Sequence, residues 1–153
     1  MPAIDFKTWA GMTTLLCVIG LLVAAISPAV AEEPIAGRWY SPSHVKAGKR
    51  VFDANCAVCH GDQGQGLAED WKQPLADGSY PPPPLNGTAH TWHHPASQLM
   101  RTISEGGAAF GGKMPGFSKL LSDVEKATVI AYFQNWWPQE IYDEWIKRGG
   151  LEN

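Results

Sequence analysis

The sequence feature that most constrains this chain is the run Cys56-Ala57-Val58-Cys59-His60. Two thiols at this spacing can each add to one vinyl group of the same porphyrin, and the imidazole that follows then lies under the iron. The motif predicts one covalently attached haem c, with Cys56 and Cys59 as the anchors and His60 as the proximal iron ligand. A length of 153 residues favours a single domain around that group.

The first 31 residues have the pattern of an export signal. Lys7 lies in a polar start, residues 15–26 are apolar, and Ala29-Val30-Ala31 matches an A-x-A cleavage site. Residues 12–31 also approach the ~20 apolar residues that span a bilayer, so an uncleaved membrane anchor is the alternative. We therefore expect a periplasmic location, with attachment to the inner membrane if the segment is kept. Unprotected thiols tend to pair in that compartment, so something must occupy the sulfurs of Cys56 and Cys59.

The haem motif is predicted to end a helix. Apolar periodicity indicates a helix from about residue 44 to residue 57, with Ser43 as its N-cap. Gly48 and Phe52 share one face of this helix with Cys56, and that face should look toward the group that the sulfur holds. The missing side chain of Gly48 predicts a close crossing with another helix.

Three further helices are predicted, over residues 95–105, 123–137 and 138–148. The clearest of them starts at Ser122, where Ser122 and Glu125 form a capping box, and it stops at Pro138. The sequence shows no convincing strand. The predicted fold class is therefore all-α.

Two methionines, Met100 and Met114, remain after residue 31 as candidates for the sixth iron ligand. A haem that transfers electrons has both axial positions filled, and a thioether raises its reduction potential relative to a second histidine. Met100 lies beside Leu99 in a helical apolar pattern, which favours a place in the core. Met114 lies on a glycine-rich loop before Pro115 and has no helical face to fill. Met114 is the predicted ligand.

Over most of its length after residue 31, the chain resembles the class I cytochromes c. The segments that carry the resemblance are the first helix with Gly48 and Phe52, the motif ending at His60, the turn Pro84-Leu85-Asn86-Gly87, the loop Lys113-Met114-Pro115, and the helix containing Tyr132 and Phe133. The resemblance implies an all-α fold wrapped around one covalent haem. It also implies a proline carbonyl near Pro83 or Pro84, with Pro84 as the candidate, that accepts the proton on the far nitrogen of His60.

These expectations divide the chain into four parts. They are a signal peptide or anchor (1–31), an arm (32–42), a cytochrome c domain (43–137) and an amphipathic C-terminal extension (138–153). The proline run and the extension depart from the smallest members of the family, which leaves the electron partner open.

Two other uses of the cysteines have to be weighed. A redox-active pair or a short disulfide, as in thioredoxin-like proteins, would want a strand before the helix, and the sequence offers none. A zinc site could combine the cysteines with His90, His93 and His94, but the spacing of these histidines does not match the usual paired ligands. The same histidines could collect copper or supply a second haem ligand, although histidines beside a proline-started helix are more often exposed or capping groups.

The function predicted from the sequence is one-electron transfer without transformation of a substrate, between redox protein partners whose identity is open. A formal net charge of −3 offers no basic field for nucleic acid. Two alternatives remain. The chain could be the haem-bearing subunit of a membrane-bound dehydrogenase or oxidase complex, or a protein whose Met114 loop opens so that the iron reacts with peroxide or binds a gas.

Overall fold

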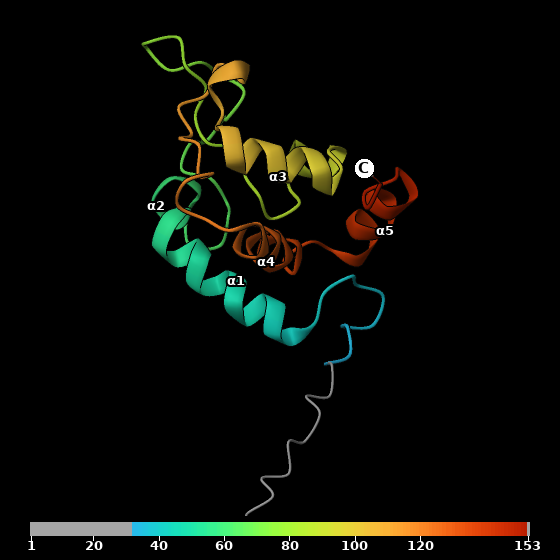
Figure 1. Ribbon diagram of the computed structural model, residues 1–153. Coiled ribbons are helices and arrows are strands. Elements are labelled where there is room, and N and C mark those ends of the chain that lie inside the picture. Colours follow the sequence, from blue (N-terminus) through green and yellow to red (C-terminus); the bar gives the residue numbers. More distant parts are fainter. Residues whose placement is uncertain (1–31, 153) are drawn as a thin grey trace, which may run out of the picture. The chain divides into compact units, whose positions relative to one another are not determined.

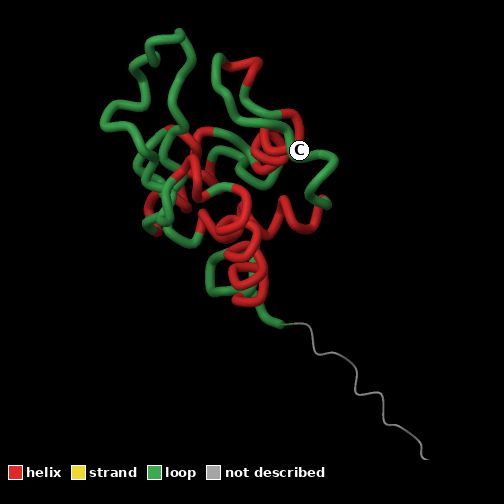
Figure 2. Tube along the Cα trace, turned by 90° about the vertical axis from the view of Figure 1, so that its left-hand side faces the viewer, coloured by secondary structure: helices red, strands yellow, loops and turns green. Residues whose placement is uncertain are grey.

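Helices and loops make up residues 32–152, the part of the chain that this computed structural model describes (Figure 1). The helices are α1 (Pro42–Asn55), α2 (Ala57–His60), η1 (His90–His93), α3 (Ala96–Glu105), η2 (Ala108–Phe110), α4 (Asp123–Gln134) and α5 (Gln139–Lys147), where η marks a 3-10 helix. Figure 2 shows helices in red joined by long loops in green. The described residues contain no β-strand, and their only β-type pairing is an isolated bridge between Tyr80 and Gly112. The predicted all-α class is confirmed.

The described residues belong to one compact unit. The predicted export signal, residues 1–31, lies outside them. Within residues 32–152, no helix combines the length and the apolar character that crossing a membrane requires.

Helix α1 begins two residues earlier than predicted. Its N-cap is Ser41 rather than Ser43, and Pro42 occupies the first helical position, where its fixed φ suits the helix and its missing N–H costs nothing. The ring of His44 completes the cap, because its Nδ1 accepts from the Ser41 amide (3.2 Å) and lies 2.8 Å from the Ser41 hydroxyl oxygen. The prediction of Ser43 was therefore wrong, because the capping box forms around Ser41 with a histidine in the place where glutamate or glutamine is usual.

Helix α4 is the central element, and its predicted start is confirmed. The Ser122 amide donates to the Glu125 carboxylate (2.9 Å), and the Glu125 amide donates back to the Ser122 hydroxyl (3.3 Å). Every residue of the helix from Thr128 to Gln134 is buried, so the protein covers this part of α4 on all sides. The helix ends at Gln134, three residues before the predicted end. Beyond it the amides of Trp136 and Trp137 donate to carbonyls three residues back, instead of the four of an α-helix.

Helices α1 and α4 cross in direct backbone contact at Gly48. A Cβ atom at Gly48 would lie 1.9 Å from the carbonyl oxygen of Thr128 and 2.8 Å from the Cβ of Tyr132. Next to the crossing, Phe52 is fully buried and packs edge-on against Tyr132 and Trp136, with ring centroids 5.4 and 5.2 Å away. The close crossing predicted from Gly48 and Phe52 is therefore present.

The arm before α1 and the C-terminal helix α5 pack against each other. The Trp39 amide donates to the Tyr142 hydroxyl (3.1 Å), and the Arg38 guanidinium lies 4.0 Å above the Tyr142 ring. Arg38 also donates to the carbonyl of Trp137 (3.2 Å), between α4 and α5. Tyr142 is fully buried, so the arm and the extension share one part of the core.

Helix α3 covers the other side of α4. Pro95 is its N-cap rather than its first residue, and Gly106 ends it as predicted. Lys126 of α4 is buried and donates to the Ser104 hydroxyl of α3 (2.8 Å). These contacts fix where the glycine-rich loop after α3 begins.

Candidate haem site

The two predicted anchors lie where α1 meets α2. α1 ends at Asn55, and the Cys56 amide donates to the carbonyl of Phe52 (2.8 Å). The Cys56 carbonyl accepts from the amides of Cys59 (3.1 Å) and His60 (2.9 Å). One helical turn therefore separates Cys56 from Cys59, which places both sulfurs on the same side of the chain. Both thiols are free; that of Cys56 is half-buried and that of Cys59 is exposed.

The environment of Cys56 does not suit a redox-active pair. Burial raises the pKa of the Cys56 thiol to about 11, and the nearby Cys59 adds to the rise. Reactive cysteines of disulfide oxidoreductases need the opposite, a lowered pKa that supplies thiolate at neutral pH. At neutral pH the Cys56 thiol therefore stays protonated, which disfavours a redox-active pair.

His60 is held in a defined orientation. Its side chain is buried, and Nδ1 lies 2.9 Å from the carbonyl oxygen of Pro83. Burial lowers the pKa of the ring, an effect partly offset by this hydrogen bond. A carbonyl can only accept, so Nδ1 carries the proton and the neutral ring keeps the lone pair of Nε2 free to bind a metal.

The expected role of Pro84 needs a correction. Pro83, not Pro84, accepts from His60, and the carbonyl of Pro84 instead accepts from the Thr91 hydroxyl (3.0 Å). Successive carbonyls of an extended chain point to different sides, so only one of the two prolines can face the imidazole. The other one anchors η1.

The loop after His60 and the turn at residues 84–87 form a rigid frame. The Leu85 amide donates to the Gly64 carbonyl (2.6 Å), and the Leu85 carbonyl accepts from the Trp137 indole (2.8 Å). Gly64 has a φ of +61°, and a Cβ there would lie 2.7 Å from the Trp136 ring. Glycine is therefore required at this position, and the frame that holds His60 is fixed to the end of α4.

The two candidate methionines lie in different surroundings. Met100 packs against the hydrophobic core, as predicted. Met114 is half-buried in the loop after η2, outside the hydrophobic core clusters of the described residues. Its backbone is held by the Gly107 amide, which donates to the Met114 carbonyl (2.9 Å). A Cβ at Gly106 would lie 2.6 Å from that carbonyl oxygen, so the loop turns as tightly as glycine permits.

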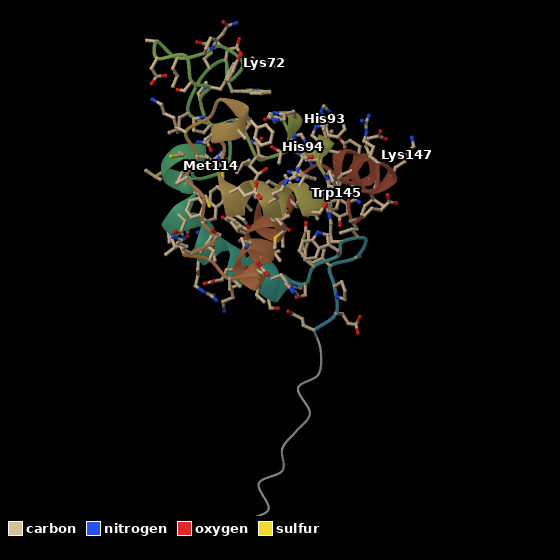
Figure 3. All side chains as sticks on the ribbon, turned by 45° about the horizontal axis from the view of Figure 1, so that its top comes forward. Lys72, His93, His94, Met114, Trp145 and Lys147 are labelled. Atoms are coloured by element: carbon tan, nitrogen blue, oxygen red, sulfur yellow. The ribbon has the colours of Figure 1, made fainter. Side chains whose placement is uncertain are left out.

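The histidine-rich segment lies on another side of the molecule. Figure 3 shows His93 and His94 on the side of α5, with Trp145 nearby, and Met114 on the side of α2. The Trp145 indole donates to the carbonyl of His94 (2.8 Å), and the His90 ring stacks on Trp71 with centroids 4.6 Å apart. Among residues 32–152, no group of three histidine, cysteine or acidic side chains is placed to hold a metal ion. The zinc hypothesis thus finds no support.

Several residues that shape the site give no signal in the sequence. Thr91 ties η1 to Pro84, although a single threonine after a turn carries no pattern. Tyr80 donates its amide to the carbonyl of Gly111 (2.9 Å), and Asp77 pairs with Lys113. The last two contacts join residues that are 31 and 36 positions apart in the sequence, which no local pattern can reveal.

The donor set fits a covalently bound haem c. The site offers two free thiols one turn apart and an imidazole with an available Nε2, while a thioether stands on a separate loop. Large apolar side chains on the surrounding loops are exposed, namely Leu67 by 66%, Tyr80 by 46% and Phe110 by 62%. Such apolar surface suits a large flat apolar group.

Comparison with known proteins agrees with this geometry. The family described as "Cytochrome C oxidase, cbb3-type, subunit III" matches residues 43–133. The cbb3-type cytochrome c oxidase subunit CcoP of Azospirillum sp. (strain B510) is 34% identical over 101 residues, and that of Azospirillum brasilense is 36% identical over 88 residues. The alignments cover 65% and 58% of this chain, but 31% and 27% of the relatives. This chain thus spans about a third of the length of these curated relatives.

A solved structure is also similar. It is cytochrome cL of the marine methylotroph Methylophaga aminisulfidivorans MPT, with a TM-score of 0.48 and 20% sequence identity. The similarity covers 72% of this chain and 67% of that one.

Proposed function

The chain belongs to the family of cytochrome c domains described as subunit III of cbb3-type cytochrome c oxidase, and we propose that it is a one-electron carrier with a single covalently bound haem c. The observation that carries this proposal is the geometry of α2. Two free thiols lie one turn apart, and the following imidazole is buried with its Nδ1 bound to Pro83. In this proposal Cys56 and Cys59 anchor the haem and His60 is its proximal ligand.

Met114 is the sixth ligand in this proposal. The support is that Met100 is used in the core, whereas Met114 stands on a tightly held loop outside it. His93 and His94 lie toward α5 and Trp145, which disfavours them as the second axial ligand (Figure 3).

The bound haem would supply the electron by alternating between ferrous and ferric iron. The residues of the chain keep its surroundings constant. Pro83 fixes the tautomer and the orientation of His60, and the frame around Leu85 ties this segment to α4. Ligands that keep their positions in both oxidation states lower the reorganisation needed for electron transfer. We place the protein on the periplasmic side of the membrane, where the predicted export signal would send it.

A second candidate function is favoured by the relatives. Both are named as CcoP subunits of cbb3-type cytochrome c oxidase. We propose, as the alternative to a freely diffusing carrier, that this domain delivers electrons as part of such a membrane complex. Co-purification with oxidase subunits from solubilised membranes supports the complex. Recovery of the haem protein alone in the periplasmic fraction supports the carrier.

The proposed function is tested by expressing the chain with a haem-attachment system. The intact mass should rise by one haem, and a redox titration should follow a one-electron curve. The double variant Cys56→Ala/Cys59→Ala should carry no covalent haem. A protein without haem, or with more than one, contradicts the proposal.

A further inference from the structure

The segment from Asp77 to Pro83 touches both loops that carry the proposed axial ligands. At its end, the Pro83 carbonyl holds the His60 ring at 2.9 Å. Three residues earlier, the Tyr80 amide donates to the carbonyl of Gly111 at 2.9 Å, in the loop that leads to Met114. The same short stretch of chain is thus fixed to both sides of the site.

The stretch between these two contacts is stiff. Residues 81–84 are all proline, so each φ is fixed and the segment has no backbone donor that another pairing could use. An extended proline chain advances about 3.1 Å per residue, so the three steps from Tyr80 to Pro83 span about 9 Å. The stretch can serve as a spacer of constant length between the two loops.

The other end of the segment is a tight turn that presents a carboxylate to the Met114 loop. The Leu75 amide donates to the Ser79 carbonyl (2.7 Å), and the Ser79 amide donates to Oδ1 of Asp77 (3.0 Å). One carboxylate oxygen therefore holds the turn, while the other, Oδ2, pairs with the ammonium of Lys113. Lys113 is the residue directly before Met114.

Tyr80 completes the attachment through its ring. Gly111 has a φ of +75°, and a Cβ there would lie 3.3 Å from Cδ2 of Tyr80. The ring thus lies against the backbone of Gly111, which has no side chain, in the loop that leads to Met114. Within this loop, the Gly112 amide donates to the Gly107 carbonyl (3.0 Å), and the Gly107 amide donates to the Met114 carbonyl (2.9 Å). A continuous series of contacts leads from Tyr80 to Met114.

We propose that residues 77–83 form a positioning strap that sets the place of the Met114 loop relative to His60, with Asp77 and Tyr80 as the positioning residues. This inference rests on the proposed role of Met114 as a ligand. It adds that the hold of Met114 on the sixth position is governed by a segment that lies 31 to 37 residues earlier in the sequence. Loosening the strap gives an external ligand easier access to that position, while the fold stays intact.

The test is competition between Met114 and added imidazole in the ferric holoprotein. Imidazole displaces methionine from the iron, and the loss of the weak far-red methionine–iron absorption band gives its apparent Kd. Charge reversal is applied on each side as Asp77→Lys and Lys113→Glu, and then as the double swap. Glu69→Lys is the matched control, because it makes the same charge change in the same loop and no ion pair joins Glu69 to the described part of the Met114 loop.

The strap predicts that each single reversal tightens imidazole binding by about fivefold, the upper range for an exposed ion pair. The double swap should return the apparent Kd to within about twofold of the wild-type value. Glu69→Lys should likewise have an apparent Kd within about twofold of the wild-type value. The differences should shrink in 1 M salt, because the side chains of the pair are 50% and 67% exposed. Tyr80→Ala should also tighten imidazole binding, with the guanidinium unfolding midpoint nearly unchanged.

Single reversals that match the wild type overturn the strap, as does a double swap that restores nothing. A wild-type holoprotein that lacks the methionine band overturns both the strap and the proposed ligation by Met114. That result is seen before any variant is made, so the two failures are distinguishable.

Discussion

Gly48 is the position where one added methyl group should disturb the fold most clearly. In Gly48→Ala, the new Cβ would lie 1.9 Å from the carbonyl oxygen of Thr128 and 2.5 Å from the carbonyl carbon of the same residue. Both atoms belong to the backbone of α4 and cannot rotate away. Opening 1.9 Å to an ordinary contact of 3.4 Å moves the helices apart by about 1.5 Å. Phe52, packed edge-on against Tyr132, would lose contact as well.

Overpacking of this kind costs about 3 kcal/mol, the upper part of the usual range. Alanine has a higher helix propensity than glycine, so the substitution by itself stabilises the helix by about 1 kcal/mol and offsets part of this cost. The net loss in the free energy of unfolding is therefore about 2 kcal/mol. With a denaturant dependence of about 4 kcal/mol/M, the guanidinium midpoint of the holoprotein should fall by about 0.5 M.

The assay is guanidinium unfolding followed by helical circular dichroism. Lys46→Gly, at an exposed position of the same helix, measures the propensity term alone and should cost about 1 kcal/mol. A Gly48→Ala protein that is more stable than the wild type would follow propensity only. That result would refute the close crossing of α1 and α4.

Two further substitutions test the frame and the α4 cap. Thr91→Val removes the hydroxyl that donates to Pro84 (3.0 Å) and should lower the free energy of unfolding by about 1 kcal/mol, read from the guanidinium midpoint; an unchanged midpoint would contradict this role. Ser122→Ala removes the cap of α4 and should cost about 1 kcal/mol at neutral pH. Hydrogen bonds from Ser122 lower the pKa of Glu125 from its usual 4.5, so this carboxylate stabilises the fold above pH 4.5 and loses that contribution as the pH falls through the lower folded-state value. The gap in unfolding midpoint between Ser122→Ala and the wild type should therefore narrow in acid, and a gap that widens would contradict the cap.

The features that could be read from the sequence are those that depend on neighbours in the chain. The capping box at Ser122 needs only two residues three positions apart. The core position of Met100 follows from helical periodicity, and the crossing at Gly48 follows from a small residue beside Phe52 on one helix face. In each case local chemistry and tertiary packing favour the same structure.

The features that were missed depend on which way a backbone carbonyl points, on an uncommon capping residue, or on contacts between segments far apart in the sequence. Which carbonyl of the proline run faces His60 is decided by how the run leaves the turn, so Pro83 and Pro84 could not be told apart. The N-cap of α1 moved to Ser41 because Pro42 and His44 together complete it. The contact of Tyr80 with Gly111 joins two loops whose approach is set by the whole fold.

The C-terminal extension shows the same limit. Its amphipathic pattern predicts a helix with one buried face, and the structure buries Tyr142 and Trp145. The pattern does not say what covers that face. The structure supplies the answer: Arg38 and Trp39 of the arm contact Tyr142, and the carbonyl of His94 accepts from Trp145.

The central claim is that one covalent haem is held between His60 and Met114. Its most direct test is the absorption spectrum of the ferric holoprotein for the wild type and two variants, Met114→Ala and Met100→Leu. We expect the weak far-red methionine–iron band in the wild type and in Met100→Leu, since exchanging these side chains in the core is nearly volume-conserving, and its loss in Met114→Ala. A band that survives Met114→Ala, or one that disappears in Met100→Leu, would contradict the account.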